Sequence, residues 1–215
     1  MNGHVKSMHF QLCMEAAATL LSLLLIMAVD STRGVAASSN QECGNPLLQT
    51  LRLTKLIRME SVELLRKYKA SQGELSELFC KGSLSEVPDP NISGLESSQR
   101  IASISMQLQA FLPHFKWVYE QQTDLLSPTS LLLDQLSTVR ARSRDLVALV
   151  NNFYRDLFPN LPAPEPAGGP TTLPPRKNYF QQKLYGCIVL KTYKDFLFNA
   201  IEELRSLKTR CAGGR

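Results

Sequence analysis

Apolar residues recur at the three- and four-residue spacing of a single helical face in four long segments of the chain. The segments span about residues 46–71, 96–122, 128–158 and 178–208. No stretch of useful length alternates with the period of two that a half-buried strand shows. The pattern therefore predicts an all-α protein built from four helices.

The positions expected to face the core share this helical spacing. On the first three segments they are Leu47, Leu48, Leu51, Ile57, Val62, Leu65, Tyr68, Ile101, Ile104, Leu108, Phe111, Leu112, Phe115, Val118, Leu131, Leu132, Leu136, Val139, Leu146, Leu149, Val150, Phe153 and Leu157. Pro46 and Pro128 are expected in first helical turns, where a missing N–H costs nothing. Pro113 lies inside the second segment and predicts a kink, with a break into two helices as the alternative.

The connections between the predicted helices are long, short and long in turn. Residues 73–95 join the first two helices, and only residues 123–127 join the second to the third. Residues 159–175 contain seven prolines and two glycines, so we expect an extended crossover there. Short links make neighbouring helices antiparallel, whereas long crossovers allow consecutive helices to run parallel. The order predicts a long-chain four-helix bundle with up-up-down-down topology and two long crossover loops.

The N-terminal segment has the character of an export signal. Ala16–Val29 is an uncharged run of 14 residues, which is shorter than the roughly 20 that cross a bilayer. Small residues follow at Val35-Ala36-Ala37, so we expect cleavage after Ala37, give or take about two residues. An uncleaved signal anchor is the alternative. The interpretation predicts a signal peptide at residues 1–37 and a secreted domain at residues 38–215.

Four of the five cysteines lie beyond the expected cleavage point, at Cys43, Cys80, Cys187 and Cys211. An even number in an exported chain indicates two disulfides, with three possible pairings. In the predicted topology, the start of the first helix lies beside the end of the fourth, and the end of the first lies beside the start of the fourth. This arrangement favours the pairs Cys43–Cys211 and Cys80–Cys187, because a disulfide needs Cα atoms within about 7 Å.

One glycosylation sequon, Asn91-Ile92-Ser93, lies among the prolines and glycines of the first crossover. We expect Asn91 on an exposed loop and carrying a glycan once the chain is exported.

Charge and composition exclude several functions. The net charge of +5 has no dense basic tract, which fits weak attraction to acidic surfaces such as glycosaminoglycans and speaks against nucleic-acid binding. His114 is the one histidine beyond the expected leader, and no cluster of metal ligands or Gly-rich phosphate loop accompanies it. We therefore expect a monomer that is not an enzyme, holds no cofactor or metal and does not insert into membranes.

The start of the fourth helix carries the most specific pattern, KNYFQQKLYGCIVLKTYKDF at residues 177–196. Phe180-Gln181-Gln182-Lys183 matches an F-x-x-K signature, and Gly186-Cys187 follows it. With YKASQG at 68–73 and FCKG at 79–82, the chain resembles the interleukin-6 family. The resemblance is to the branch of leukaemia inhibitory factor, oncostatin M and ciliary neurotrophic factor, and it is closest to leukaemia inhibitory factor.

The resemblance implies a secreted cytokine that cross-links a leukaemia-inhibitory-factor-type receptor and glycoprotein 130 and so activates receptor-associated kinases (JAK-STAT signalling). By the F-x-x-K signature, Phe180 and Lys183 would contact the first receptor. The alternative makes Phe180 a hydrophobic staple and Lys183 a solvated side chain. The exposed faces of the first and third helices would contact glycoprotein 130. Candidate residues there, off the apolar stripes, are Arg52, Lys55, Arg142 and Asp145.

Two other interpretations remain open at this stage. A secreted amphipathic-helix protein could bind lipid, and burial of the apolar stripes in one compact core would distinguish it from a cytokine. A secreted hydrolase would need an active-site constellation around His114.

Overall fold

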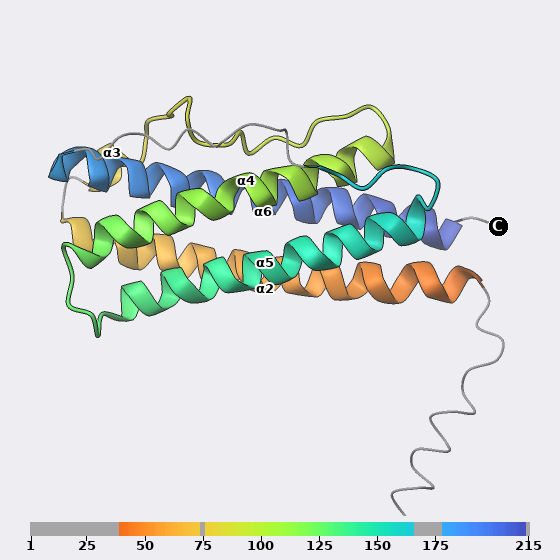
Figure 1. The fold of residues 1–215 in the computed structure, drawn as a ribbon, viewed down its shortest axis with the longest axis horizontal. Helices are drawn as coiled ribbons and strands as arrows, with labels where there is room; N and C mark the ends of the chain where they lie inside the picture. The colour runs from red at the N-terminus through yellow and green to blue at the C-terminus, as the bar shows by residue number, and fades with distance from the viewer. Residues whose placement is uncertain (1–38, 74–75, 166–177, 214–215) are drawn as a thin grey trace, which may run out of the picture. The chain divides into compact units, whose positions relative to one another are not determined.

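The computed structural model describes residues 39–73, 76–165 and 178–213 (Figure 1). The side chains of residues 39–43, 79 and 209–213 are outside the described part. The chain divides into two compact units, Met1–Gln41 and Glu42–Arg215. The expected signal peptide, residues 1–37, lies outside the described residues.

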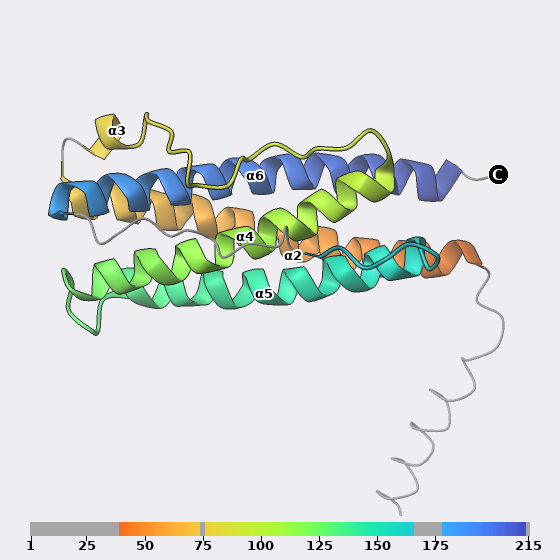
Figure 2. The ribbon, with the colours of Figure 1, turned by 45° about the horizontal axis from the view of Figure 1, so that its top comes forward.

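Four long helices form the second unit: α2 (Ser39–Gln72), α4 (Ser97–Thr123), α5 (Leu131–Leu157) and α6 (Tyr179–Gly213), with one short turn of helix, α3 (Ser76–Phe79), after α2. The described residues contain no strand. Figures 1 and 2 show α2 and α4 running in one direction and α5 and α6 in the opposite direction. The predicted all-α, up-up-down-down bundle is confirmed.

Two of the helices begin elsewhere than the prolines suggested. α2 begins at Ser39, so Pro46 lies inside it. The prediction missed these first turns because the polar residues before Pro46 carry no apolar periodicity that would indicate a helix. α5 begins at Leu131, and Pro128 lies in the link before it. There the Ser130 N–H donates to the Ser127 carbonyl at 2.9 Å, which forms a turn that accepts proline at its second position. α4 continues through Pro113, which excludes the break into two helices.

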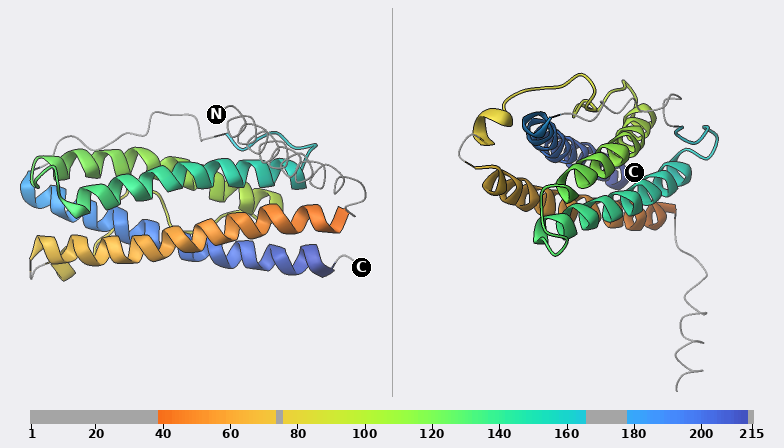
Figure 3. Two further views of the ribbon diagram at one scale, coloured as in Figure 1. Left: turned by 90° about the horizontal axis from the view of Figure 1, so that it is seen from below. Right: turned by 60° about the vertical axis from the view of Figure 1, so that its left-hand side comes forward.

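An aromatic cluster occupies the centre of the bundle. Phe111 and Phe115 of α4 pack against Tyr193 and Phe196 of α6, and all four are fully buried. The Phe115 and Tyr193 rings meet edge to face with centroids 4.7 Å apart, a favourable aromatic geometry. The Tyr193 hydroxyl lies 2.6 Å from Ser143 Oγ of α5, so its polar end is satisfied inside the core. Figure 3 shows α2 between α5 and α6, which closes the bundle around this centre.

Two predicted core positions are wrong. Val62 is 44% exposed and Leu131 is 59% exposed. Ser61 is buried in the place expected for Val62, and its hydroxyl donates to the Ile57 carbonyl at 2.8 Å. A small polar residue with its hydrogen bond satisfied by its own helix can occupy a core position, and an apolar pattern does not detect it.

The first crossover lies along the bundle and is attached to α6 at several points. Cys80 forms the predicted disulfide with Cys187, with Cα atoms 5.2 Å apart. Val87 is buried, and Asn199 Nδ2 donates to the Pro90 carbonyl at 3.0 Å. Asn91 of the sequon is exposed.

The second expected disulfide, Cys43–Cys211, stays a prediction. Both side chains are outside the described part of the chain. The first turns of α2 and the last turns of α6 lie at the same end of the bundle (Figure 1), as this pairing requires.

Candidate functional site

The start of α6 is fixed by reciprocal hydrogen bonds between Asn178 and Gln181. Asn178 Oδ1 accepts from the Gln181 N–H at 2.9 Å, and Gln181 Oε1 accepts from the Asn178 N–H at 3.2 Å. This exchange satisfies two N–H groups that a helix start otherwise leaves unpaired. This capping box was not predicted, although Asn followed three residues later by Gln is its recognisable signal in the sequence.

Two aromatic side chains and one cation project from this first turn. Tyr179 is 56% exposed and Phe180 is 54% exposed. The Lys183 Nζ atom lies 4.3 Å from the centroid of the Tyr179 ring, a cation–π arrangement that keeps the ammonium group beside the aromatic pair. Of the predicted residues, Phe180 is thus exposed and Lys183 is half-buried, and both lie at a capped helix start.

Beneath this surface, Tyr68 of α2 holds α6 in place. Its hydroxyl donates to the backbone carbonyl of Lys183 at 3.3 Å and accepts from Gln122 Nε2 of α4 at 3.3 Å. Tyr68 is fully buried, and burial raises the pKa of its hydroxyl, which therefore remains protonated. A Cβ atom at Gly186 would lie 2.2 Å from the Tyr68 hydroxyl oxygen. The absence of a side chain at Gly186 is what allows this contact.

A second surface is a groove of about 430 Å³ between α2 and α5. Its apolar lining includes Leu56, Met59 and Leu131, which are 37%, 62% and 59% exposed. Glu63 also lines the groove. Hydrogen bonds from Arg66 lower the pKa of Glu63 to about 2, so this carboxylate stays ionised at neutral pH and is paired with Arg66.

The four charged candidates of the sequence analysis continue this face along the two helices. Arg52 and Lys55 of α2 are exposed, as is Asp145 of α5. Arg142 forms an ion pair with Glu60 across the two helices. The charges were predicted from the sequence but the apolar groove was not, because the groove depends on how two helices distant in sequence align.

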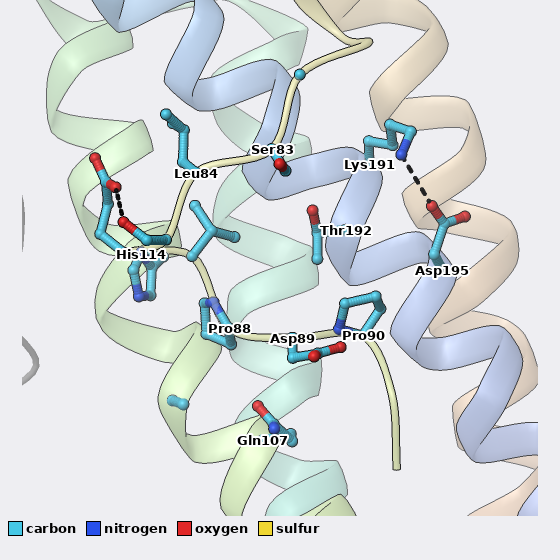
Figure 4. A pocket seen from close by; sticks show the side chains of 15 residues that line it. Ser83, Leu84, Pro88, Asp89, Pro90, Gln107, His114, Lys191, Thr192 and Asp195 are labelled. Atoms are coloured by element: carbon cyan, nitrogen blue, oxygen red, sulfur yellow. Dashed lines mark hydrogen bonds and ion pairs between the residues drawn. The ribbon is translucent and has the colours of Figure 1, made fainter.

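A third hollow, of about 740 Å³, lies under the first crossover (Figure 4). Residues 82–90 cross between α4 and α6, and the hollow is also lined by His114, Lys191 and Asp195. Lys191 Nζ pairs with Asp195 at 3.5 Å. His114 Nδ1 lies 2.6 Å from the Tyr185 hydroxyl, so the histidine is bonded to a tyrosine rather than to a serine or cysteine nucleophile. The arrangement joins the crossover to the bundle and offers no hydrolase geometry.

Acidification is expected to destabilise the fold through His114. Burial lowers the pKa of His114 to about 4, against a smaller raising effect of Glu86, whereas an unfolded histidine titrates near 6.5. The unfolded state therefore takes up the proton first, and the free energy of unfolding falls as pH drops from about 6.5 to about 4, by about 3 kcal/mol. The free energy of unfolding, measured with urea at pH 7 and at pH 4, should show this decrease in the wild type. The His114→Gln variant should lack this contribution to the decrease. Equal pH dependence in the two proteins would contradict the assignment.

The described residues contain no group of three His, Cys, Asp or Glu side chains that could hold a metal ion. Among the described helices, none combines the length and the apolar character that crossing a membrane requires.

Four helices in up-up-down-down order with two long crossovers are the architecture of long-chain helical cytokines, and this is the class that the fold defines. Comparison with protein families gives the family: the model of ciliary neurotrophic factor matches residues 27–215, and the chain belongs to the ciliary neurotrophic factor family. This is a family of interleukin-6-type cytokines and not an enzyme family; its members are generally secreted and bind cytokine receptors. A comparison with curated proteins finds no match.

Proposed function

We propose that the chain is a secreted cytokine that holds two different receptors at once. The start of α6, with Phe180 and Lys183, contacts a leukaemia-inhibitory-factor-type receptor, and the α2–α5 groove contacts glycoprotein 130. Bringing the two receptors together activates the kinases attached to them and starts JAK-STAT signalling. The observation that carries this proposal is a capped helix start with two exposed aromatic side chains, Tyr179 and Phe180, and a half-buried Lys183 whose ammonium group lies over the Tyr179 ring.

The physical case for the α6 surface rests on preorganisation. Binding is costly when flexible groups must be ordered, and a surface held in its bound geometry avoids much of that cost. Here the capping box fixes the first turn, and Tyr68 ties the carbonyl of Lys183 to α2. An exposed aromatic beside a cation is also the composition that binding hot spots favour.

The α2–α5 groove supplies a second surface on different helices. Exposed Met59 and Leu131 are costly to leave in water, and a partner that covers them gains their burial. Arg52, Lys55, Arg142 and Asp145 would border that contact and set its orientation rather than its affinity.

Several further features complete the proposal. Residues 1–37 act as a signal peptide, Asn91 carries a glycan, and Cys43 pairs with Cys211. Within the family, we propose that the chain is most similar to leukaemia inhibitory factor, and the F-x-x-K and YKASQG patches support this. The lipid-binding alternative is disfavoured, because the apolar stripes of all four helices are buried in one common core.

Replacing Met59 and Leu131 by Asp is expected to weaken binding to the glycoprotein 130 ectodomain by more than about tenfold, because each loses an apolar anchor and adds a charge to the interface. Both side chains are largely exposed, so the fold should be unaffected. Surface plasmon resonance against both ectodomains measures the effect, and binding to the leukaemia-inhibitory-factor-type receptor should not change.

The matched control is Leu161→Asp, since Leu161 is 45% exposed and lies outside both surfaces. Unaltered glycoprotein 130 binding by the double variant, with wild-type binding present, would remove the groove from the proposal.

A further inference from the structure

Positive charge is concentrated on the side of the bundle that α2 and α6 form. Residues 44–72 and 179–208, whose side chains are the described ones of these two helices, include eleven Lys and Arg and only five Asp and Glu. The other described residues include seven Lys and Arg against ten Asp and Glu. Figure 3 shows α2 and α6 on one side of the bundle and α4 and α5 on the other. The excess of cations therefore lies on α2 and α6, and the rest of the described chain is acidic.

Four cations form a strip along the distal half of α6, on the side that faces α2. The guanidinium carbon of Arg58 on α2 lies 5.2 Å from the centroid of the Phe198 ring on α6, which fixes the alignment of the two helices. Lys194 lies one turn before Phe198, and Arg205 and Lys208 lie about two and three turns after it on the same side of α6. Because a helix rises about 1.5 Å per residue, this distal strip is about 21 Å long.

The cations of the distal strip are accessible to a ligand. Lys208 is exposed and has no ion-pair partner within the described part of the chain. Lys194 and Lys191 share the single carboxylate of Asp195, at 3.0 and 3.5 Å. Arg205 pairs with a glutamate of its own helix, and about half of each side chain is exposed. Ion pairs at exposed positions are weak, so an anionic ligand can compete for these cations.

An extended polyanion fits the distal strip better than a protein partner does. Protein interfaces are depleted of lysine and have a centre that is poor in charge. Cations placed at successive turns of a helix instead match a chain that carries an anionic group on each repeating unit, and they bind such groups through charge-assisted hydrogen bonds. Members of the family are generally secreted, and the abundant polyanions outside the cell are sulfated glycosaminoglycans.

We propose that the distal strip binds a sulfated glycosaminoglycan, an interaction that goes beyond the proposed receptor function. Successive sulfate groups accept hydrogen bonds from the ammonium and guanidinium groups of the strip. The nearest of these cations on α6, Lys194, is eleven residues from Lys183, which is about 16 Å along the helix. A bound glycan therefore leaves the start of α6 open to a receptor and retains the secreted chain beside the cell surface.

The location is tested with two triple variants that have equal net charge. The first removes three cations of the distal strip: Lys194→Gln, Arg205→Gln and Lys208→Gln. The second is the matched control and removes three exposed cations of α4 and α5: Lys116→Gln, Arg144→Gln and Arg155→Gln. Isothermal titration with a heparin dodecasaccharide at physiological salt measures the affinity, and circular dichroism checks that both variants fold.

The strip variant should bind the dodecasaccharide about tenfold more weakly than the wild type, because each exposed ion contact contributes a few-fold in affinity at most. The control should lose less than about twofold, because salt screens attractions beyond about 10 Å. An equal loss in the two folded variants would overturn the assignment of the glycan to this strip.

The chemistry of the ligand is tested with the disulfide-intact wild-type chain. Desulfated heparin, which keeps its carboxylates, should bind at least about tenfold more weakly than heparin, because affinity for a polyanion rises with the number of anionic groups neutralised. Vesicles that contain phosphatidylserine should bind no better than desulfated heparin. Binding of either probe as tight as that of heparin would overturn the assignment to sulfate groups. Failure of the chain to bind heparin would overturn the inference and leave the proposed function, which is measured with receptor ectodomains, intact.

Discussion

Replacing Phe180 and Lys183 together by alanine is expected to weaken binding to the leukaemia-inhibitory-factor-type receptor by about 100-fold or more, because buried aromatic and cationic anchors each contribute on the order of 2 kcal/mol or more at interfaces. Phe180 is 54% exposed, and the structure uses the backbone carbonyl of Lys183 rather than its ammonium group to bind Tyr68. The fold should therefore survive the double substitution. Surface plasmon resonance against the ectodomain, with circular dichroism of the variant, measures both effects.

The same helix offers a matched control. Phe198 is 48% exposed and Lys194 lies one turn before it, so Phe198→Ala with Lys194→Ala removes the same two residue types from the middle of α6. This control should bind the receptor as the wild type does. If both double variants lose affinity equally, α6 contributes a general surface and the F-x-x-K residues have no special role.

Gly186→Ala is expected to destabilise the bundle by about 1–3 kcal/mol, the usual cost of overpacking a core. The new Cβ would meet the hydroxyl oxygen of Tyr68 at 2.2 Å and its Cζ atom at 2.7 Å. Tyr68 is fully buried and bonded at its hydroxyl to α4 and α6, so it has little freedom to move. The sign is informative, because the same change in an open helix would stabilise it by about 1 kcal/mol. Urea unfolding followed by circular dichroism gives the free energy of unfolding of the variant and of the wild type, and thus the sign of the change.

The contact between residue 186 and Tyr68 predicts that Tyr68→Phe partly relieves the destabilisation caused by Gly186→Ala. In a Tyr68→Phe background the hydroxyl is gone but the ring carbon at 2.7 Å remains, so Gly186→Ala should cost less there without becoming neutral. A neutral or stabilising Gly186→Ala in the wild-type background would show that Tyr68 does not occupy this position. The variant should also weaken receptor binding, because displacing Tyr68 moves the first turns of α6.

The topology could be predicted from the sequence because helical periodicity and the positions of prolines are local signals. The order of long and short links then determined the direction of each helix, and the Cys80–Cys187 disulfide followed from that order. Pro128 was misplaced because proline suits both a first helical turn and the turn that precedes a helix. Val62 was wrongly predicted to lie in the core. Ser61 holds that core position, and a serine looks like a surface residue in the sequence.

Features that depend on two distant segments could not be predicted. Leu56 and Leu131 each look like an ordinary stripe residue, and the groove between them exists only once α2 and α5 are aligned. The need for glycine at residue 186 likewise depends on Tyr68, more than one hundred residues earlier in the chain. The cations of α2 and α6 likewise form one basic side only once the two helices lie together. The Asn178–Gln181 capping box, by contrast, is local and was readable from its spacing.

The central claim is that one chain holds two unlike receptors through separate surfaces. Its most direct test is analytical ultracentrifugation of the disulfide-intact chain, residues 38–215, mixed with the soluble ectodomains of the leukaemia-inhibitory-factor-type receptor and glycoprotein 130. The account predicts a complex that contains the chain and both ectodomains, reduced to the chain with glycoprotein 130 alone by Phe180→Ala with Lys183→Ala. Mutually exclusive binding of the two ectodomains, or binding of neither, would contradict it.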